Sequence, residues 1–257
     1  MTTLADTVRA VAAVTPNRVA LVVDGTAQRR TYGELDRRAC QLANGLLAAG
    51  LRPGDHVAAW LDDSIEYVEL YIAAACAGLV VSPVNAMFTA EEAAFQIEDV
   101  AASALFVSDR LVGEVPKLDL DGVRLLVNVG DERCEGAVGL GALIAGASAQ
   151  RPTAPEPSAT FVIGYTSGTT GQPKGAMLSH EAVMAAVRTT ALLCRLPLYG
   201  TMTYAASMSF VATVTCFLFT HLYTRATVVF VPDRSAAGLI AATERHRATF
   251  TYVATRC

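Results

Sequence analysis

The sequence has no excess of charge of either sign and no cluster of basic residues. Its 257 residues include 20 Lys and Arg against 24 Asp and Glu, for a formal net charge of −4, and the two signs are mixed along the chain. A nucleic-acid-binding surface needs a basic face that neutralises phosphates. We therefore expect no nucleic-acid partner.

Paired cysteines and a signal peptide are also lacking. The six cysteines lie far apart and form no CxxC pair, so neither a metal-ligand spacing nor a disulfide framework is indicated. The first residues carry Asp6 and Arg9 where a signal peptide would have an unbroken apolar core. These features predict a cytoplasmic protein whose first segment is a helix ending at Pro16.

One long apolar segment, Leu196 to Thr224, exceeds the roughly 20 residues that a membrane-spanning helix needs. Hydroxyl side chains interrupt it, and each one weakens partitioning into lipid. They are Thr201, Thr203, Ser207, Ser209, Thr213, Thr215 and Thr220. We expect a buried helix of a soluble protein here and no membrane span.

The sequence is rich in apolar residues, at 53%, and these alternate between strand-like and helix-like segments. Continuous apolar runs predict buried strands, and the segments between them have helical spacing. Thr31 and Glu34, and again Thr89 and Glu92, have the spacing of capping boxes that begin helices. The strands are predicted over 57–61, 79–81, 104–107, 123–129, 159–165, 176–178, 226–231 and 249–253, with helices between them. The predicted fold class is α/β, with mainly parallel sheets flanked by helices.

The pattern breaks between about Gly130 and Ser158, where Gly, Ala and Pro accumulate. We interpret this stretch as a linker between two lobes of one large domain, residues 1–150 and residues 151–257. The second lobe begins with a strand that leads into the most informative part of the sequence.

That part is FVIGYTSGTTGQPKGAMLSH, residues 161–180. A Gly-rich and hydroxyl-rich turn after a strand exposes several backbone N–H groups, which suit phosphate oxygens, and Lys174 adds a positive charge. A plain surface loop has a similar composition, but the preceding strand and the following helix, capped by Ser179, favour a ligand loop at a sheet edge. The Walker A pattern is excluded because Lys174 follows Pro173 and precedes Gly175.

The eleven residues Tyr165 to Gly175, YTSGTTGQPKG, resemble the phosphate-binding signature of the adenylate-forming superfamily, which includes acyl-CoA synthetases, luciferases and peptide-synthetase adenylation domains. The resemblance extends over nearly the whole chain, from Thr31-Tyr32-Gly33-Glu34-Leu35 to the segment 244–249. Pro83-Val84-Asn85, followed by Thr89-Ala90-Glu91-Glu92, looks more like acyl- and aryl-CoA synthetases than amino-acid-activating domains.

This resemblance implies an ATP-dependent acid–thiol ligase that converts a carboxylic acid to an acyl-adenylate and passes the acyl group to coenzyme A. Its implied ATP-binding residues are Thr166, Ser167, Gly168, Thr169, Thr170, Gly171 and Lys174. Thr166 would also help to hold Mg²⁺, and Lys174 would be a positioning charge, not a general base. No residue is assigned a catalytic role.

The resemblance also implies an aromatic or Pro-x-x-His segment that lines the carboxylate site. Its best counterpart is Ser207-Met208-Ser209-Phe210, which lacks both Pro and His. Phe210 is the candidate for the substrate-binding ring and Tyr204 a weaker one, although aromatic residues here also suit a core. We expect His180 to be a surface or cap residue and His221 to be a packing residue.

The later motifs of the superfamily, which bind Mg²⁺ and ribose and supply the catalytic lysine, cannot be located in this sequence. We therefore expect the N-terminal part of an acyl-CoA synthetase, truncated and inactive on its own. The alternative is a short form that binds a nucleotide or a partner without catalysis.

Overall fold

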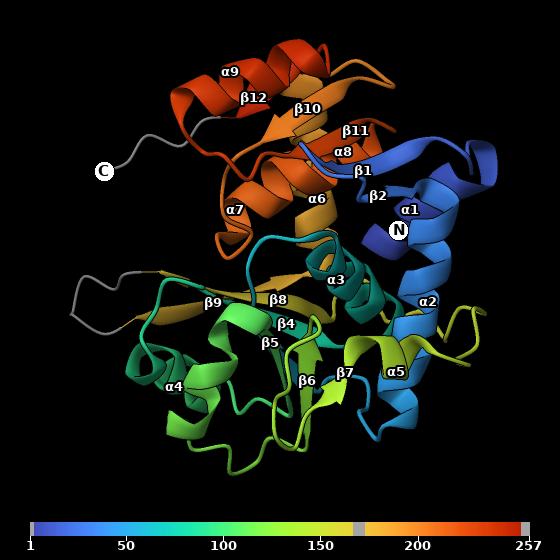
Figure 1. Cartoon of the computed structure of the whole chain (residues 1–257). Helices are drawn as coiled ribbons and strands as arrows, with labels where there is room; N and C mark the ends of the chain where they lie inside the picture. The colour runs from blue at the N-terminus through green and yellow to red at the C-terminus, as the bar shows by residue number, and fades with distance from the viewer. Residues whose placement is uncertain (1–2, 167–172, 253–257) are drawn as a thin grey trace.

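Two mostly parallel β-sheets are stacked with helices between them and on their outer faces (Figure 1). The structure is a computed structural model that describes residues 3–166 and 173–252. The sequence-based prediction of an α/β fold with mainly parallel sheets and flanking helices is confirmed.

The larger sheet has seven strands in the order β7-β6-β5-β3-β4-β8-β9, and in its described part only β9 runs antiparallel to its neighbour. Its strands are β3 (His56–Trp60), β4 (Val80–Val84), β5 (Ala104–Ser108), β6 (Leu125–Val129), β7 (Val138–Gly139), β8 (Thr160–Thr166) and β9 (Lys174–Ser179). Its central strands read as apolar runs in the sequence because both faces of this sheet are covered.

The smaller sheet has five strands in the order β12-β10-β11-β1-β2, with β2 antiparallel to β1. Its strands are β1 (Val19–Val23), β2 (Arg29–Thr31), β10 (Thr201–Tyr204), β11 (Thr227–Phe230) and β12 (Phe250–Tyr252). The N-terminal and C-terminal parts of the chain therefore share this sheet, while β8 and β9 belong to the larger one. The two sheets do not follow a division of the chain at residue 150.

Helices form three layers around the sheets. Between the sheets lie α1 (Leu4–Val14), α2 (Tyr32–Ala48), α3 (Ile65–Ala77), α6 (His180–Leu193) and the run of α7 (Val211–Thr213), η2 (Val214–Phe219) and α8 (Thr220–Tyr223). The outer face of the larger sheet carries α4 (Ala90–Asp99) and η1 (Asp109–Lys117), and the outer face of the smaller sheet carries α9 (Ala236–Arg245).

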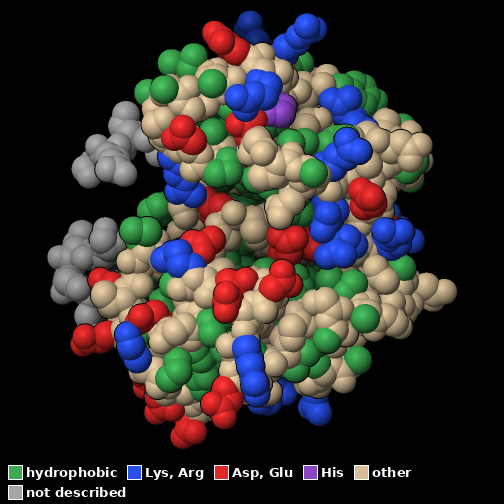
Figure 2. All heavy atoms as spheres, in the orientation of Figure 1, with side chains coloured by type: hydrophobic (Ala, Val, Ile, Leu, Met, Phe, Trp, Pro, Cys, Tyr) green, Lys and Arg blue, Asp and Glu red, His purple; other side chains and the backbone are tan. Residues whose placement is uncertain are grey.

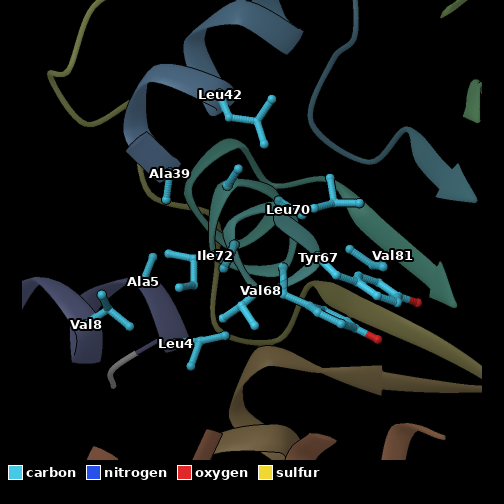
Figure 3. Close-up of a cluster of buried hydrophobic side chains, with 14 of the residues drawn as sticks. Leu4, Ala5, Val8, Ala39, Leu42, Tyr67, Val68, Leu70, Ile72 and Val81 are labelled. Atoms are coloured by element: carbon cyan, nitrogen blue, oxygen red, sulfur yellow. The ribbon is translucent and has the colours of Figure 1, made fainter. Parts of the chain in front are cut away.

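The centre of the core is α3, which is buried on almost every side. Figure 3 shows it surrounded by side chains from α1, such as Leu4 and Val8, and from α2, such as Leu42. The buried Glu69 of α3 accepts hydrogen bonds from Arg30 at 2.9 Å and Arg38 at 2.6 Å. A helix that is apolar all round is expected where two sheets enclose it.

Both predicted capping boxes are present. The Thr31 hydroxyl accepts from the Glu34 N–H at 3.2 Å while the Glu34 carboxylate accepts from the Thr31 N–H at 2.8 Å, and Thr89 and Glu92 form the same pair of bonds. Each cap accepts hydrogen bonds from backbone N–H groups that have no partner within the helix. Such a cap stabilises a helix by about 1 kcal/mol. These local sequence patterns fix where α2 and α4 begin.

Two sequence-based interpretations need correction. The segment Leu196 to Thr224 is not one buried helix: the strand β10 (Thr201–Tyr204) lies in its first half, and helical structure begins only at Val211. The stretch 130–158 is not a plain linker, since it contains β7 and α5 (Leu140–Ile144). In the part of the chain that the structure describes, no helix has the length and apolar character needed to span a bilayer.

Candidate functional site

The phosphate-loop candidate includes the ends of two antiparallel strands, β8 and β9, which pair as a hairpin at one edge of the larger sheet. The register places Thr166 directly opposite Lys174 and Tyr165 opposite Gly175. Thr166 and Lys174 are both exposed, so their hydroxyl and ammonium groups are accessible to a ligand. The predicted ligands Ser167, Gly168, Thr169, Thr170 and Gly171 lie outside the described residues.

Gly175 of the motif has a packing role that the structure explains. A Cβ atom on Gly175 would lie 2.9 Å from the Ile163 side chain and 3.3 Å from the Tyr165 ring, so no larger residue fits without a shift. The Tyr165 hydroxyl donates to the Asp99 carboxylate of α4, and burial raises the pKa of Tyr165. The end of the hairpin that carries Thr166 and Lys174 is therefore tethered to α4.

An apolar cavity of about 550 Å³ opens beside the hairpin tip. Phe88 and Phe95 form its wall on the α4 side, and Thr166 and Phe210 line its other side. A mostly apolar hollow with a few polar groups at one end is typical of a small-molecule site. The hairpin and the Phe210 ring, which are far apart in the sequence, thus line the same cavity.

A second cavity of about 460 Å³ lies at the carboxyl ends of β3 and β4 and shares Phe210 with the first. The chain leaves β3 toward α3 on the inner face of the sheet, but leaves β4 toward α4 on the outer face. Parallel sheets open a crevice where successive connections go to opposite faces. Asp63 after β3 and Asn85 after β4 line that crevice.

Charged side chains from distant segments meet in this second cavity. Asp62 pairs with Arg110 at 2.7 Å and accepts from the Ser108 hydroxyl at 2.9 Å, while the adjacent Asp63 pairs with Arg234. Figure 2 shows side chains of both charges gathered where the two sheets face each other, and the surface is hollowed there. Sequence reasoning missed this cluster, although all of its members lie just after strand ends.

The predicted substrate ring, Phe210, is 57% exposed and forms part of both cavities. Tyr204, the weaker candidate, is buried and its hydroxyl bonds the Thr213 hydroxyl at 3.0 Å. Tyr204 lines a smaller hollow of about 150 Å³ near Arg234. The geometry favours Phe210 over Tyr204, and its role in substrate binding stays a prediction.

His180 differs from the expectation of a surface or cap residue. It is the first residue of α6, but its ring is buried and stacks on Phe161 at 4.6 Å. Neither ring nitrogen has a hydrogen-bond partner among the described residues, and burial lowers the pKa of His180 to about 4. His221 is a packing residue as expected: it is buried against Phe250, and burial lowers its pKa too.

Among residues 3–166 and 173–252, His, Cys, Asp and Glu side chains form no cluster of three that could hold a metal ion. The predicted Mg²⁺ ligand, Thr166, offers a single exposed hydroxyl at the hairpin end. Its assignment as a metal ligand stays a prediction.

A sequence model of the family described as AMP-binding enzyme matches residues 8–257. The chain belongs to the AMP-binding enzyme family. It is 36% identical over 175 residues to a feruloyl-CoA synthase from Amycolatopsis sp., an alignment that covers 66% of this chain and 32% of that protein. It is 31% identical to a fatty acid–[acyl-carrier-protein] ligase from Streptomyces coeruleorubidus, over 66% of this chain and 31% of that protein.

Solved structures match the fold over nearly the whole chain. The structure of a putative long-chain-fatty-acid CoA ligase from Rhodopseudomonas palustris superposes with a TM-score of 0.84 at 30% identity, covering 97% of this chain and 62% of that one. An anthranilate CoA ligase in complex with anthranoyl-AMP gives a TM-score of 0.89 at 21% identity, over 98% of this chain and 49% of that one. The chain matches about a third of the length of the feruloyl-CoA synthase and of the acyl-carrier-protein ligase.

Proposed function

We propose that this chain is the N-terminal part of an ATP-dependent acyl-CoA synthetase, which activates a carboxylic acid as an acyl-adenylate and transfers it to coenzyme A. The observation that carries the proposal is the β8–β9 hairpin, whose register sets Thr166 opposite Lys174 beside an apolar cavity. Family membership and the CoA ligases among the relatives support the class of reaction. A cytoplasmic location and a role in fatty acid metabolism belong to the same proposal.

The residues at the hairpin fit a polyphosphate. The Thr166 hydroxyl and the Lys174 ammonium are exposed donors, and the exposed Gly175 lets the backbone approach a ligand closely. When bound, ATP would supply the electrophilic α-phosphorus and the pyrophosphate leaving group, with Mg²⁺ as counter-charge. In this proposal Ser167, Gly168, Thr169, Thr170 and Gly171 donate to the phosphates with Thr166, and Lys174 positions them as a fixed cation.

The apolar cavity next to the hairpin would hold the acyl group, with Phe210 as part of its wall. Its volume of about 550 Å³ suits a small organic acid, and its proximity to Thr166 would place a carboxylate near the phosphates. Coenzyme A as acyl acceptor follows from the family resemblance, and no residue of this chain is assigned to bind it.

Calorimetric titration of the 257-residue chain with Mg·ATP tests the hairpin assignment. We expect binding, weakened about tenfold or more in Lys174→Ala because a charge-assisted contact contributes about 1.5–3 kcal/mol. Lys117→Ala is the matched control, since Lys117 pairs with Glu114 on the outer face of the protein. Equal affinities in wild type, Lys174→Ala and Lys117→Ala would contradict the assignment.

A second assay addresses catalysis. We propose that the 257-residue chain alone gives no ATP–pyrophosphate exchange with a panel of carboxylic acids, because it carries only part of the machinery that the reaction needs. Substantial exchange would overturn that statement. ATP binding that persists without exchange in any longer form of the protein would favour a nucleotide-binding protein without catalysis.

A further inference from the structure

The carboxylate of Asp63 joins the two sheets. Asp63 follows β3 of the larger sheet, and its side chain is only 11% exposed. One carboxylate oxygen accepts from the Met208 backbone N–H at 2.7 Å, and the other pairs with Arg234. Met208 follows β10 and Arg234 follows β11, so both partners belong to the smaller sheet, 145 and 171 residues away along the chain.

Both backbone polar groups of Met208 have a side-chain partner. Asp63 accepts from its N–H, and the Tyr71 hydroxyl donates to its carbonyl oxygen at 3.1 Å. Tyr71 lies in the middle of α3, eight residues after Asp63, and is fully buried. Asp63 and α3 thus hold both backbone polar groups of one residue in the segment after β10, which is a far more specific contact than an exposed ion pair.

Met208 lies two residues before Phe210. Around it, the Ser207 and Ser209 hydroxyls bond each other at 2.9 Å, and the Thr213 hydroxyl donates to the Ser207 carbonyl at 2.8 Å. These contacts are local to the segment Ser207 to Thr213 and shape it. The contacts with Asp63 and Tyr71 are what fix it relative to the larger sheet and the hairpin.

We propose that Asp63 is a positioning residue: through Met208 and Arg234 it sets the place of the Phe210 ring in the wall shared by the two cavities. Asp63 itself touches no reacting group. That this wall holds the acyl group rests on the proposed function, whereas the mechanical link from Asp63 to Phe210 does not.

The same contact makes the position of Phe210 sensitive to pH. Burial raises the pKa of Asp63 to about 6, against the opposing effects of the Met208 N–H and Arg234, and the neighbouring Asp62 raises it further. Above this pH the carboxylate pairs with Arg234, and below it the pair is lost while the neutral carboxyl still accepts from Met208. The other groups that face Asp63 are Arg110 across the cavity and the hydroxyls of Tyr67, Tyr71 and Tyr204, which stay neutral because burial raises their pKa values.

Fluorine NMR of the intact chain tests this link. A trifluoromethyl group on the ring of Phe210, introduced by genetic encoding, reports the surroundings of that ring and needs neither ATP nor an acid. We expect the fluorine shift of the otherwise unchanged chain to titrate with a midpoint about pH 6. In Asp63→Asn the titration should be lost, with the shift constant from pH 4.5 to 8.

Asp62→Asn is the matched control, because Asp62 is the adjacent carboxylate but bonds Ser108 and Arg110. It should keep the titration with a slightly lower midpoint, since a like charge next to Asp63 is removed. Arg234→Gln lacks the ion pair that protonation of Asp63 breaks, so the titration should shrink in amplitude, and what remains should have a higher midpoint because an opposite charge is removed. These two variants test the inference even if Asp63→Asn fails to fold.

Three results would overturn the inference: no titration in the parent chain, an unchanged titration in Asp63→Asn, or a titration unchanged in amplitude and midpoint in Arg234→Gln. Any of them would leave the proposed function untouched. Failure of Mg·ATP to bind would count against the proposed function and leave the link between Asp63 and Phe210 standing.

Discussion

The candidate site has two sides, the β8–β9 hairpin and the contact of Asp63 with Met208 and Arg234, and they are built in different ways. On one side the β8–β9 hairpin carries its candidate ligands within eleven consecutive residues, so its chemistry is visible in the sequence. On the other side, Asp63 and Arg234 are 171 residues apart and meet only because two sheets stack. The hairpin side supplies groups for a ligand, and the Asp63 side fixes the geometry of the wall opposite them.

The largest effect is expected where the two sides touch. A Cβ atom on Gly164 of β8 would lie 2.7 Å from the Val211 side chain, next to Phe210, and a β-branched side chain at a helix start has little freedom to move. Gly164→Ala should therefore lower the free energy of unfolding by about 3 kcal/mol, the upper end for overpacking. Urea-induced unfolding of wild type and Gly164→Ala measures this loss.

Gly113→Ala is the control for this substitution, because nothing lies within 4 Å of a Cβ atom at Gly113. It should change the free energy of unfolding by no more than about 1 kcal/mol, in the stabilising direction. A loss in Gly164→Ala no larger than the change in Gly113→Ala would show that the two sides are not closely packed.

The next effect belongs to the hairpin side and depends on pH. The folded-state pKa of His180 lies below its ordinary value of 6.5, at about 4, so this group destabilises the fold as pH falls from 6.5 toward 4. Between pH 7 and pH 5 the loss amounts to about 2 kcal/mol. His180→Phe keeps the ring stack on Phe161 and should abolish this loss.

The test is the difference between wild type and His180→Phe in the free energy of unfolding, measured at pH 7 and again at pH 5. Asp63 contributes in the opposite sense, since its raised pKa favours the folded state as pH falls from 6 toward 4, but it does so equally in both proteins. The variant should gain about 2 kcal/mol relative to wild type at pH 5. An equal dependence on pH in the two proteins would contradict the buried, unpaired state of His180.

The smallest effect concerns the Asp63 side alone. Tyr71→Phe removes the hydroxyl that donates to the Met208 carbonyl at 3.1 Å but keeps the stack on Tyr67 at 5.2 Å. The loss should be about 1 kcal/mol, the usual net contribution of a hydrogen bond, with Tyr223→Phe as an exposed control near zero. If Tyr71→Phe unfolds at the same urea concentration as wild type, the hydrogen bond from Tyr71 to the Met208 carbonyl contributes little to stability.

Local patterns in the sequence were sufficient to predict much of the fold. The Thr31 and Thr89 caps and the apolar runs of β3, β5 and β8 depend on neighbours a few residues away, so their prediction was confirmed. The single helix predicted over Leu196 to Thr224 was wrong because apolar composition does not distinguish the strand β10 from a buried helix. Pairing of β10 with β11 and β12 decides between them, and these partner strands come from later parts of the chain.

The residues of the candidate site also divide into those that a local pattern predicts and those that only the folded chain brings together. The sequence indicated Thr166, Lys174 and Phe210, each of which belongs to a recognisable segment. It gave no indication that Asp63 would pair with Arg234, because stacking of the sheets sets that contact. His180 was misjudged for a related reason: its position at a helix start suggested exposure, while the packing of α6 against β8 buries it.

The central proposal is that the triphosphate binds at the motif that joins β8 to β9. Residue-by-residue NMR of the labelled 257-residue chain tests this most directly. On addition of Mg·ATP, the backbone amide shifts that change most should belong to residues 164–176 and to the segment around Phe210. Those near Lys117, on the outer face, should stay constant. Changes centred elsewhere, with residues 164–176 unaffected at saturation, would contradict the account.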